Sequence, residues 1–261
     1  MELTNSTILI TGGSSGIGLE LVKQLTAQNA AKIIITGRDA KKFAAAKERF
    51  AAIHTIQSDV AEAADIERLY QEVTRQFLAL NIVINNAGIM RNLDLVNDTL
   101  AIEDVTREID IDLTGPIRMV QRFLPHLQQQ KSAAIVNVTS GIAFMPFAIS
   151  PIYSAAKAGL RAYTRVLRTQ LKGTSVKVFE LAPPGVDSPL HTDFGGVVDK
   201  KQFMTTEKLA TSAVDGIRRD TFEIVPGLAK VARLSSRLAP AFALNMTTSY
   251  LERARAQKKK A

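Results

Sequence analysis

Tyr153 and Lys157 stand four residues apart, a spacing that could support acid–base chemistry if both lie on one helix. On a helix this spacing puts the phenol and the ammonium on the same face. A tyrosine whose pKa is about 10 transfers protons poorly at neutral pH, and a nearby cation favours tyrosinate. Ser140, just past an apolar run, could orient a substrate oxygen and share its developing charge. Because Tyr and Lys at this spacing are also common on helix surfaces, other motifs must decide the interpretation.

A glycine-rich segment with the sequence TGGSSGIG follows the first apolar run and opens an amphipathic stretch. Its glycines permit a tight turn, close approach of a pyrophosphate and close packing of a helix on a strand. The position between a strand and a helix favours dinucleotide binding over a simple Gly-rich turn. The cofactor-binding residues expected here are Thr11, Gly12, Ser14, Ser15, Gly16, Ile17 and Gly18.

Arg38 ends the second apolar run, where NAD-binding sheets commonly carry an acidic residue for the ribose 2′-hydroxyl. A guanidinium suits a 2′-phosphate instead, so NADP(H) is favoured over NAD(H). The alternative is a solvated arginine at the start of a helix, with Asp39 as its N-cap. The ends of the third and fourth runs complete the expected crevice with Asp59, Val60, Asn86, Ala87 and Gly88.

The elements that must position these residues are short apolar runs alternating with amphipathic stretches. This alternation predicts right-handed crossovers and a Rossmann-type, doubly wound α/β fold: a parallel sheet of about seven strands with helices on both faces, in three layers. The expected strands are Thr7 to Thr11, Lys32 to Thr36, Ile53 to Gln57, Ile82 to Asn85, Ala134 to Thr139, Val176 to Leu181 and Phe222 to Val225. The expected helices include Ile17 to Gln28, Asp65 to Phe77, Thr99 to Leu127 and Tyr153 to Lys172.

The chain of 261 residues, 46% hydrophobic and 22% charged, suits one compact domain. We expect a catalytic domain over residues 1 to 227, with a loop from 187 to 208 covering the site. A basic helical extension is expected from 228 to 261.

The positive charge of this chain is concentrated near its C-terminus. Residues 228 to 261 carry eight Lys or Arg against Glu252 alone, which leaves the rest of the chain nearly neutral despite a net charge of +8. Nucleic acid is therefore not an expected partner. On a helical wheel, one arc is apolar (Leu228, Val231, Leu234, Leu238) and another is basic (Lys230, Arg233, Arg237), with Pro240 breaking the helix. Such an element could lie on an anionic membrane surface, but covering the body or a subunit interface is favoured.

Several classes of protein are not expected from this sequence. It contains no cysteine and only three scattered histidines, so no metal site is expected. It shows neither the basic, apolar start of a secretory signal nor an apolar run of about 18 residues, and we expect a cytoplasmic protein.

The order of TGxxxGxG, NNAG, Ser140 and Tyr-x-x-x-Lys closely resembles the single-domain branch of the short-chain dehydrogenase/reductase superfamily, over residues 5 to 227. The resemblance implies an NADP(H)-dependent oxidoreductase that interconverts a carbonyl and a hydroxyl on a small, apolar substrate, working as a homodimer or homotetramer. Tyr153 would exchange a proton with the substrate oxygen, Lys157 would lower its pKa and bind the nicotinamide ribose, and Ser140 would hold the substrate.

The same resemblance assigns further cofactor contacts. Asn86 to Gly88 would shape the adenine-side wall, and Asp59 and Val60 would touch the adenine. The run LAPPGVDSP also resembles a branch of these reductases named for the bacterial teichoic-acid D-alanylation operon. Its residues expected near the nicotinamide are Pro184, Gly185, Val186 and Ser188.

Asp112 departs from the family pattern, in which a catalytic asparagine occupies this position of an Asn-Leu-x-Gly motif. A carboxylate about 6 Å from Lys157 would interact with it by roughly 2 to 3 kcal/mol at an effective dielectric of 20, and would oppose tyrosinate formation. We therefore expect Asp112 to shift activity to higher pH unless a cation such as Arg107 or Lys131 neutralises it. The alternative is a tolerated variant.

An apolar substrate cleft is expected from residues between Ser140 and Tyr153 and in the long loop. The candidates, half of which could be core, are Phe144, Met145, Phe147, Ile149, Leu190, Phe194 and Phe203. His191 is expected to be a surface residue. The alternative function is a cofactor-binding sensor or regulatory protein with weak turnover, which Asp112 alone supports.

Overall fold

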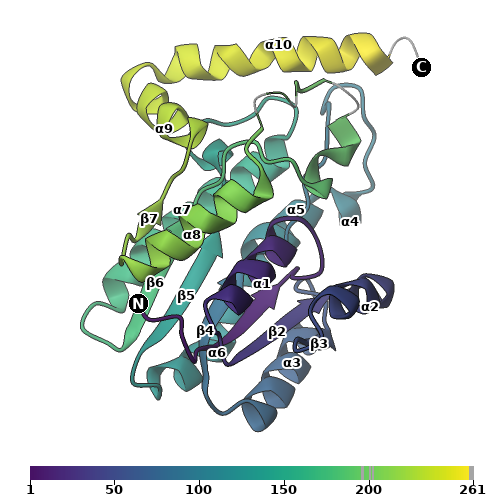
Figure 1. The fold of residues 1–261 in the computed structure, drawn as a ribbon. Coiled ribbons are helices and arrows are strands. Elements are labelled where there is room, and N and C mark those ends of the chain that lie inside the picture. The colour runs from purple at the N-terminus through teal and green to yellow at the C-terminus, as the bar shows by residue number, and fades with distance from the viewer. Residues whose placement is uncertain (195–196, 200, 202, 259–261) are drawn as a thin grey trace.

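The computed structural model describes residues 1–194, 197–199, 201 and 203–258 of the chain. Its centre is a seven-stranded parallel sheet in the order β3-β2-β1-β4-β5-β6-β7, with helices on both faces (Figure 1). This confirms the predicted three-layer, Rossmann-type fold. The strands are β1 (Thr7–Thr11), β2 (Lys32–Gly37), β3 (His54–Gln57), β4 (Leu80–Asn85), β5 (Ala133–Val138), β6 (Val176–Leu181) and β7 (Glu223–Ile224).

The helices that flank the sheet bury two separate apolar cores. Along β1, Ile8 and Ile10 point into one core and Leu9 into the other, so an unbroken apolar run still follows the two-residue period of a strand. One core is covered by α1 (Gly16–Ala27), α2 (Ala40–Arg49) and α8 (Thr206–Arg218). The other is covered by α3 (Ala63–Gln76), α6 (Gly115–Gln128) and α7 (Pro151–Gln170).

The strand order reverses at β1, which pairs with β2 on one side and β4 on the other. Crevices in such sheets form outside the carboxyl ends of the strands at this reversal, because the two following connections leave toward opposite faces. The fold therefore places the segments after β1, β2, β4 and β5 around one crevice.

The long helix expected from Thr99 to Leu127 is wrong in its first half. The structure has two short helices, α4 (Ile102–Val105) and α5 (Arg107–Ile109), then a π-helical turn η1 (Asp110–Thr114), before α6 begins. Pro116 stands in the first turn of α6, directly after the π-helical turn, and has no backbone N–H to donate to that turn. Single π-helical turns are frequent at functional sites, and this one contains Asp112.

The predicted loop from 187 to 208 lies partly outside the described residues. Its described part includes a 3₁₀ segment, η3 (Pro189–Phe194), and Val186 forms a bridge with Met204. Thr205 then caps α8 by accepting a hydrogen bond from the backbone N–H of Lys208 at 3.2 Å. The predicted loop is therefore partly structured, and its last residues already belong to α8.

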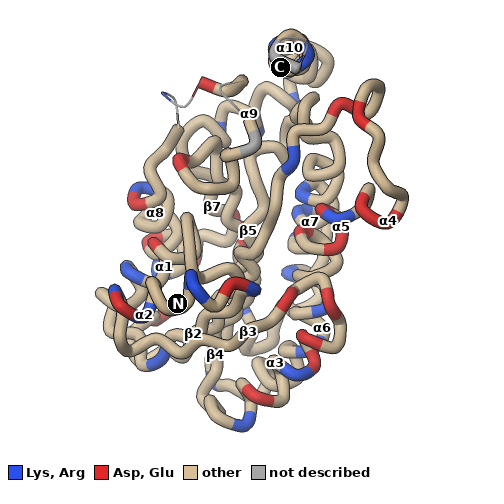
Figure 2. The backbone as a smooth tube through the Cα atoms, turned by 90° about the vertical axis from the view of Figure 1, so that its right-hand side faces the viewer, with Lys and Arg blue, Asp and Glu red and all other residues tan. Residues whose placement is uncertain are grey.

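The C-terminal segment forms two helices, α9 (Leu228–Leu238) and α10 (Pro240–Lys258), that pack on the body. Figures 1 and 2 show α10 lying across one end of the molecule. Arg255 pairs with Asp94 through two contacts of 2.7 and 2.9 Å, and Ala254 beside it is buried. Among the described residues, no helix combines the length and apolarity needed to cross a membrane. Lys259 and Lys260, part of the predicted basic tail, fall beyond the described residues.

Candidate active site

The glycine-rich loop joins β1 to α1 at the strand reversal. Gly12 has a φ of +64°, and a Cβ on it would lie 2.9 Å from the Ala87 Cα. A Cβ on Gly18 would lie only 2.3 Å from the Gly12 carbonyl oxygen. Ser15, the N-cap of α1, makes no side-chain capping bond, so the first N–H groups of the helix have no side-chain partner there. This geometry supplies free donors and the positive end of a helix dipole to an anion.

Thr11 and Gly18 shape this loop from behind and do not line the cleft. The Thr11 hydroxyl accepts hydrogen bonds from the backbone N–H groups of Asn86 and Ala87, each at 3.0 Å. The Asn86 side-chain amide donates to the carbonyl oxygens of Thr11 and Gly12 at 3.0 and 3.1 Å. The turn after β4 is thereby fastened to the loop after β1. Direct cofactor contact by Thr11 and Gly18 is therefore not supported, and their contribution is to hold the loop in position.

One cleft of about 880 Å³ runs along the carboxyl ends of the strands. Both the glycine loop and the segments after β2 to β6 line it, so a single cavity spans the expected cofactor and substrate halves. The expected cofactor residues on its wall are Gly12, Ser14, Ser15, Gly16, Ile17, Arg38, Asp59, Val60, Asn86, Ala87, Gly88, Tyr153, Lys157, Pro184, Gly185, Val186 and Ser188. The cleft, its glycine turn and the helix N-terminus fit a dinucleotide with its pyrophosphate at α1.

The basic end of the cleft is at β2. Arg38 lines the cleft and lies 3.5 Å from Asp59, with about half of its side chain exposed. Asp39 accepts hydrogen bonds from the backbone N–H groups of Lys41 and Lys42 at 2.9 and 3.3 Å, which makes it the N-cap of α2. Because the Asp39 carboxylate caps this helix, the groups at this strand end that suit a phosphate are the guanidinium of Arg38 and the ammonium of Lys42, which also lines the cleft.

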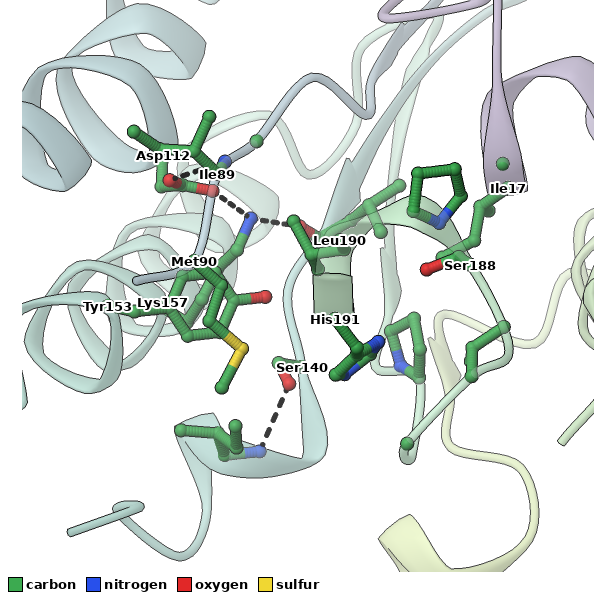
Figure 3. A pocket seen from close by; sticks show the side chains of 18 of the residues that line it. Ile17, Ile89, Met90, Asp112, Ser140, Tyr153, Lys157, Ser188, Leu190 and His191 are labelled. Carbon is green, nitrogen blue, oxygen red and sulfur yellow. Dashed lines mark hydrogen bonds and ion pairs between the residues drawn. The ribbon is translucent and has the colours of Figure 1, made fainter. Parts of the chain in front are cut away.

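Ser140, Tyr153 and Lys157 converge from two elements. Ser140 follows β5 and begins the 3₁₀ turn η2 (Gly141–Ala143), whose Ile142 N–H donates to its hydroxyl at 3.2 Å. Tyr153 and Lys157 lie one turn apart on α7 and are buried. Figure 3 shows the Tyr153 hydroxyl pointing into the cleft between Ser140 and Lys157. The sequence spacing therefore produces a serine, a phenol and an ammonium around one point of the cleft wall.

Asp112 contacts Lys157 directly. One carboxylate oxygen lies 3.0 Å from the Lys157 Nζ, and the other accepts a hydrogen bond from the Ile89 N–H at 3.2 Å. Lys157 also donates to the Val138 carbonyl oxygen at 3.0 Å. The expected separation of about 6 Å is therefore wrong. Of the two cations expected to neutralise Asp112, Arg107 lies 3.5 Å from Asp104 instead. Within the described residues Lys131 forms no ion pair with Asp112, so Lys157 itself balances the Asp112 charge.

Burial controls the protonation of this group. It raises the pKa of Asp112 to about 6, against the opposing effect of the Lys157 charge. Burial also raises the pKa of Tyr153 well above its usual value, the Asp112 charge raises it further, and a hydrogen bond with Ser140 opposes both effects. In this geometry Tyr153 is a protonated phenol at neutral pH.

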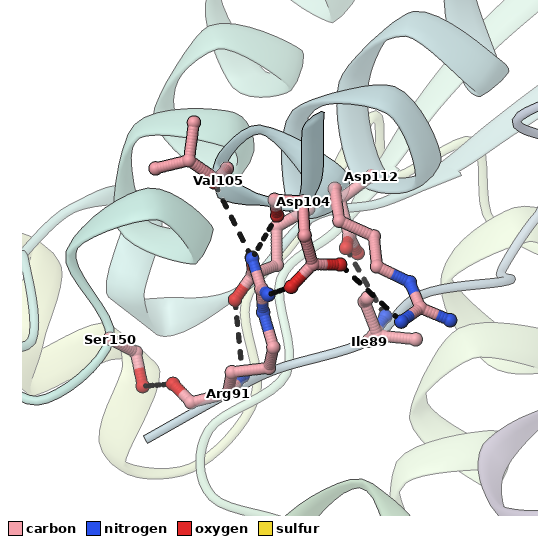
Figure 4. A network of polar contacts seen from close by, with 8 residues as sticks. Ile89, Arg91, Asp104, Val105, Asp112 and Ser150 are labelled. Atoms are coloured by element: carbon pink, nitrogen blue, oxygen red, sulfur yellow. Dashed lines mark hydrogen bonds and ion pairs between the residues drawn. The ribbon is translucent and has the colours of Figure 1, made fainter. Parts of the chain in front are cut away.

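A polar network holds the π-helical turn near α7. The Arg91 guanidinium binds both Asp104, at 2.5 Å, and the fully buried Glu108 (Figure 4). The Ser150 hydroxyl, at the N-terminus of α7, donates to the Arg91 carbonyl oxygen at 2.8 Å. The segment after β4, the helix preceding Asp112 and the start of α7 are thereby connected.

A second buried chain of hydrogen bonds fixes α7 to the sheet. The Asn85 amide donates to Asn137 at 2.8 Å, and the Asn137 amide donates to the Thr164 hydroxyl at 2.9 Å. These bonds link β4, β5 and α7 across the core. Such satisfied networks orient elements, since breaking one bond leaves a buried polar group without its partner.

The substrate half of the cleft is mostly apolar. Four of the seven expected residues line it: Met145, Phe147, Leu190 and Phe203. Ile149 and Phe194 instead belong to a buried cluster, and Phe144 packs under the Arg161 guanidinium. Three of the seven expected residues therefore lie outside the cleft lining, close to the half that was expected to be core.

The sequence analysis missed several residues of this half. His191, expected at the surface, lines the cleft with its ring 4.8 Å from that of Phe203. Others that line the cleft include Met90, Ile142, Met246, Ser249, Tyr250 and Arg253. Four of these residues come from α10. No sequence motif connects α10 to the site, so its position over the cleft could be learned only from the tertiary structure.

The fold and this site define a nucleotide-binding oxidoreductase, and comparison with known proteins identifies the family. A family model described as short chain dehydrogenase matches residues 6–195. A Bacillus subtilis (strain 168) protein named uncharacterized oxidoreductase DltE is 40% identical over 227 residues, which cover 86% of this chain and 89% of that protein. The chain belongs to the short-chain dehydrogenase/reductase family and is an NAD(P)-dependent dehydrogenase or reductase.

Solved structures of this family share the fold. A short chain dehydrogenase from Burkholderia cenocepacia J2315, in complex with NADP, superposes with a TM-score of 0.82 at 18% identity, covering 95% of this chain and 99% of that one. A short chain dehydrogenase/reductase from Burkholderia phymatum, in complex with NAD, gives 0.78 at 20% identity, covering 91% and 95%. These likenesses establish the architecture, while the choice between NADP and NAD depends on this chain's own residues.

Proposed function

We propose that this protein is an NADP(H)-preferring carbonyl reductase, reversible as an alcohol dehydrogenase, that acts on a small apolar substrate. One observation carries the proposal: the Tyr153 hydroxyl lies between Ser140 and Lys157 on the wall of the cleft that also contains the glycine loop. The apolar side chains of the substrate half support an apolar substrate. The homodimer or homotetramer that the family resemblance implies is part of the same proposal.

A nicotinamide cofactor held in this cleft would supply the hydride for reduction of a carbonyl. As the carbonyl oxygen becomes an alkoxide, the Tyr153 O–H donates its proton to it, and the Ser140 hydroxyl donates a hydrogen bond to the same oxygen. The tyrosinate that remains lies beside the Lys157 ammonium, which stabilises its charge. Alcohol oxidation runs through the same groups in reverse, with tyrosinate as the base.

The protonation of the site supports reduction as the direction at neutral pH. Reduction needs Tyr153 as a phenol, and burial together with Asp112 raises the pKa of Tyr153. Oxidation needs tyrosinate, which the same environment disfavours. Asp112 thus positions and charge-balances Lys157 at 3.0 Å while biasing the neighbouring tyrosine toward its acid form.

The preference for NADP(H) rests on Arg38. Its guanidinium lines the cleft at the end of β2, whereas the Asp39 carboxylate is used as the cap of α2. A 2′-phosphate beside Arg38 would gain a charge-assisted contact that a 2′-hydroxyl lacks. Arg38 now lies 3.5 Å from Asp59, and its guanidinium would turn away from that carboxylate to bind the phosphate.

The test of the activity is NADPH oxidation with a panel of aldehydes and ketones of increasing apolar size. We expect turnover by the wild-type chain and, in Tyr153→Phe, a loss in kcat of about 10²- to 10⁴-fold, because the general acid is removed. Tyr163→Phe, on the same helix but packed against the core, is the matched control and should keep activity. If no carbonyl is reduced while NADPH still binds, the weakly active sensor is the better assignment.

The test of the cofactor preference is Arg38→Gln. We expect the ratio of kcat/KM for NADPH to that for NADH to fall by about tenfold or more, since a charge-assisted phosphate contact is lost. Lys41→Gln removes an exposed cation of the same region that does not line the cleft, and should leave the ratio unchanged. A ratio already below one in the wild-type chain would contradict the assignment.

A further inference from the structure

Exposed apolar side chains are concentrated on α9 and the first half of α10. Thirteen large apolar side chains are exposed among the described residues, and seven of them lie between 228 and 246. The seven are Leu228, Val231, Leu234, Leu238, Phe242, Leu244 and Met246. α9 and α10 contact each other, so these side chains lie on neighbouring elements. A concentration of exposed apolar side chains of this kind marks a surface that another body covers.

The orientation of α9 is the reverse of that expected for a helix that covers the body. Ala229 is buried against the body, and a Cβ on Gly141 would lie 3.4 Å from its methyl group. Arg233, from the basic arc, turns inward to Glu223 at 3.1 Å. Leu234 and Leu238, which the sequence analysis expected to cover the body or an interface, are 59% and 76% exposed. The apolar arc of α9 therefore contributes nothing to this chain's own core.

The two helices that carry the exposed apolar side chains are also basic. Within residues 228 to 256 the only acidic residue is Glu252. Arg233 and Arg255 are used in ion pairs with the body, but Lys230, Arg237 and Arg253 are exposed and form no ion pair within the described part of the chain. Figure 2 shows basic positions in blue on α10. The surface combines apolar side chains with unpaired positive charge.

The apolar face is continuous with the cleft. Leu228 and Met246 are each more than half exposed, and both also line the cleft. Figure 1 shows that α9 and α10 together form one end of the molecule, joined by a sharp corner at Ala239. A body that covered this face would therefore lie against the mouth of the substrate half.

Either a second copy of the chain or a lipid surface could cover this apolar face, and the charges on α9 and α10 favour one of the two. A second copy of the chain packed about a twofold axis would bring the same basic patch against itself, which is unfavourable. An anionic lipid surface satisfies both features, since it accepts apolar side chains at the acyl boundary and attracts Lys and Arg at the headgroups. The structure therefore favours a membrane surface over a subunit contact.

We propose that the α9–α10 face docks on an anionic lipid bilayer, with the apolar side chains around Leu234, Leu238 and Phe242 entering the interface. The basic side chains Lys230, Arg237 and Arg253 lie near the headgroups, and the cleft mouth at Leu228 and Met246 faces the bilayer surface. The contact is peripheral and reversible.

The experiment is co-sedimentation of the full chain with vesicles of phosphatidylcholine alone or mixed with phosphatidylglycerol. We expect binding to the mixed vesicles, at least tenfold weaker binding in 0.3 M salt than in 0.05 M salt, and little binding to phosphatidylcholine alone. The double variant Leu234→Ser with Leu238→Ser should reduce binding at least tenfold, because it removes apolar contacts. Leu78→Ser, an exposed leucine at 75% on the loop before β4, is the matched control and should bind as the wild-type chain does.

NADPH binding by each variant, measured by fluorescence titration, shows that the fold is intact, since Leu234 and Leu238 do not line the cleft. Absence of binding to the anionic vesicles overturns the proposal, as does an equal loss in Leu78→Ser. A fall in the solution mass of the double variant without loss of vesicle binding would assign this face to a second copy of the chain. None of these outcomes depends on turnover, so the reductase assignment can fail or succeed separately.

Discussion

The two halves of the cleft are built in different ways. The cofactor half consists of the glycine loop and strand ends, where a Cβ on Gly18 would overlap the Gly12 carbonyl oxygen at 2.3 Å. The substrate half consists of side chains from η2, η3, α9 and α10. In the cofactor half, backbone segments lie so close together that an added side-chain atom would overlap them. In the substrate half, the wall consists of side chains that substitution can change without moving the backbone. We infer that the cofactor half determines whether the enzyme works, and the substrate half which molecule it reduces.

The sharpest test of this contrast is Gly18→Ala. Alanine normally favours a helix over glycine, but here its methyl group must displace the loop. We expect NADPH affinity to fall by about ten- to a hundredfold, since overpacking costs about 1 to 3 kcal/mol. Fluorescence titration with NADPH measures the effect.

Gly216→Ala is the control for this variant. Gly216 lies on α8, away from the cleft, and a Cβ added there would meet the side chain of Ile224 rather than backbone. It should lower the melting temperature without lowering NADPH affinity. Equal losses of affinity in the two variants would show that the tight approach of Gly18 to the loop has no special role.

Asp112→Asn tests the electrostatics where the two halves meet. Removing the carboxylate lowers the pKa of Tyr153, because the Asp112 charge raises it in the wild-type chain. The rate of alcohol oxidation should therefore rise at lower pH in the variant, with a gain of about three- to tenfold near pH 8. Rate against pH, from about 6 to 10, measures the shift. Asp110→Asn, in the same π-helical turn, is the control and should leave the profile in place.

Stability against pH gives an independent check on Asp112. Its pKa is raised from 3.8 to about 6 in the folded chain, so between these values the folded state binds more protons than the unfolded state. The free energy of unfolding should therefore fall as pH rises through that window, and this part of the dependence should be absent in Asp112→Asn. Denaturant titrations at several pH values measure it. An identical dependence in both chains would argue against a buried, titrating Asp112.

The smallest effect on activity is expected from breaking the ion pair between Arg255 and Asp94, which joins α10 to the body. Arg255→Met breaks the pair with Asp94, whose pKa the guanidinium holds well below its usual range. We expect KM for the carbonyl to rise about two- to fivefold with kcat unchanged, because the substrate wall loosens while the reacting groups stay in place. Asp94→Asn should do the same, and the double variant should be no worse than either. A change in NADPH affinity would show instead that α10 also supports the cofactor half.

Much of the cofactor half could be predicted from the sequence, because its chemistry follows local order. The strand runs, TGGSSGIG and NNAG each occupy a short segment, and parallel strands bring their carboxyl ends to one edge. The expected strands agree with the structure within two residues at each end. The expected helix from Thr99 is wrong because a π-helical turn depends on hydrogen-bond register rather than on apolar periodicity.

The sequence by itself determined the family of this protein, its strands, its glycine loop and the face shared by Tyr153 and Lys157, since each depends on neighbours close in the chain. The tertiary structure decided the rest. It placed Asp112 at 3.0 Å from Lys157, brought α10 over the substrate half and turned the apolar arc of α9 outward. The physical reason is that helical periodicity shows which side chains share a face, whereas only packing between distant segments shows what that face meets.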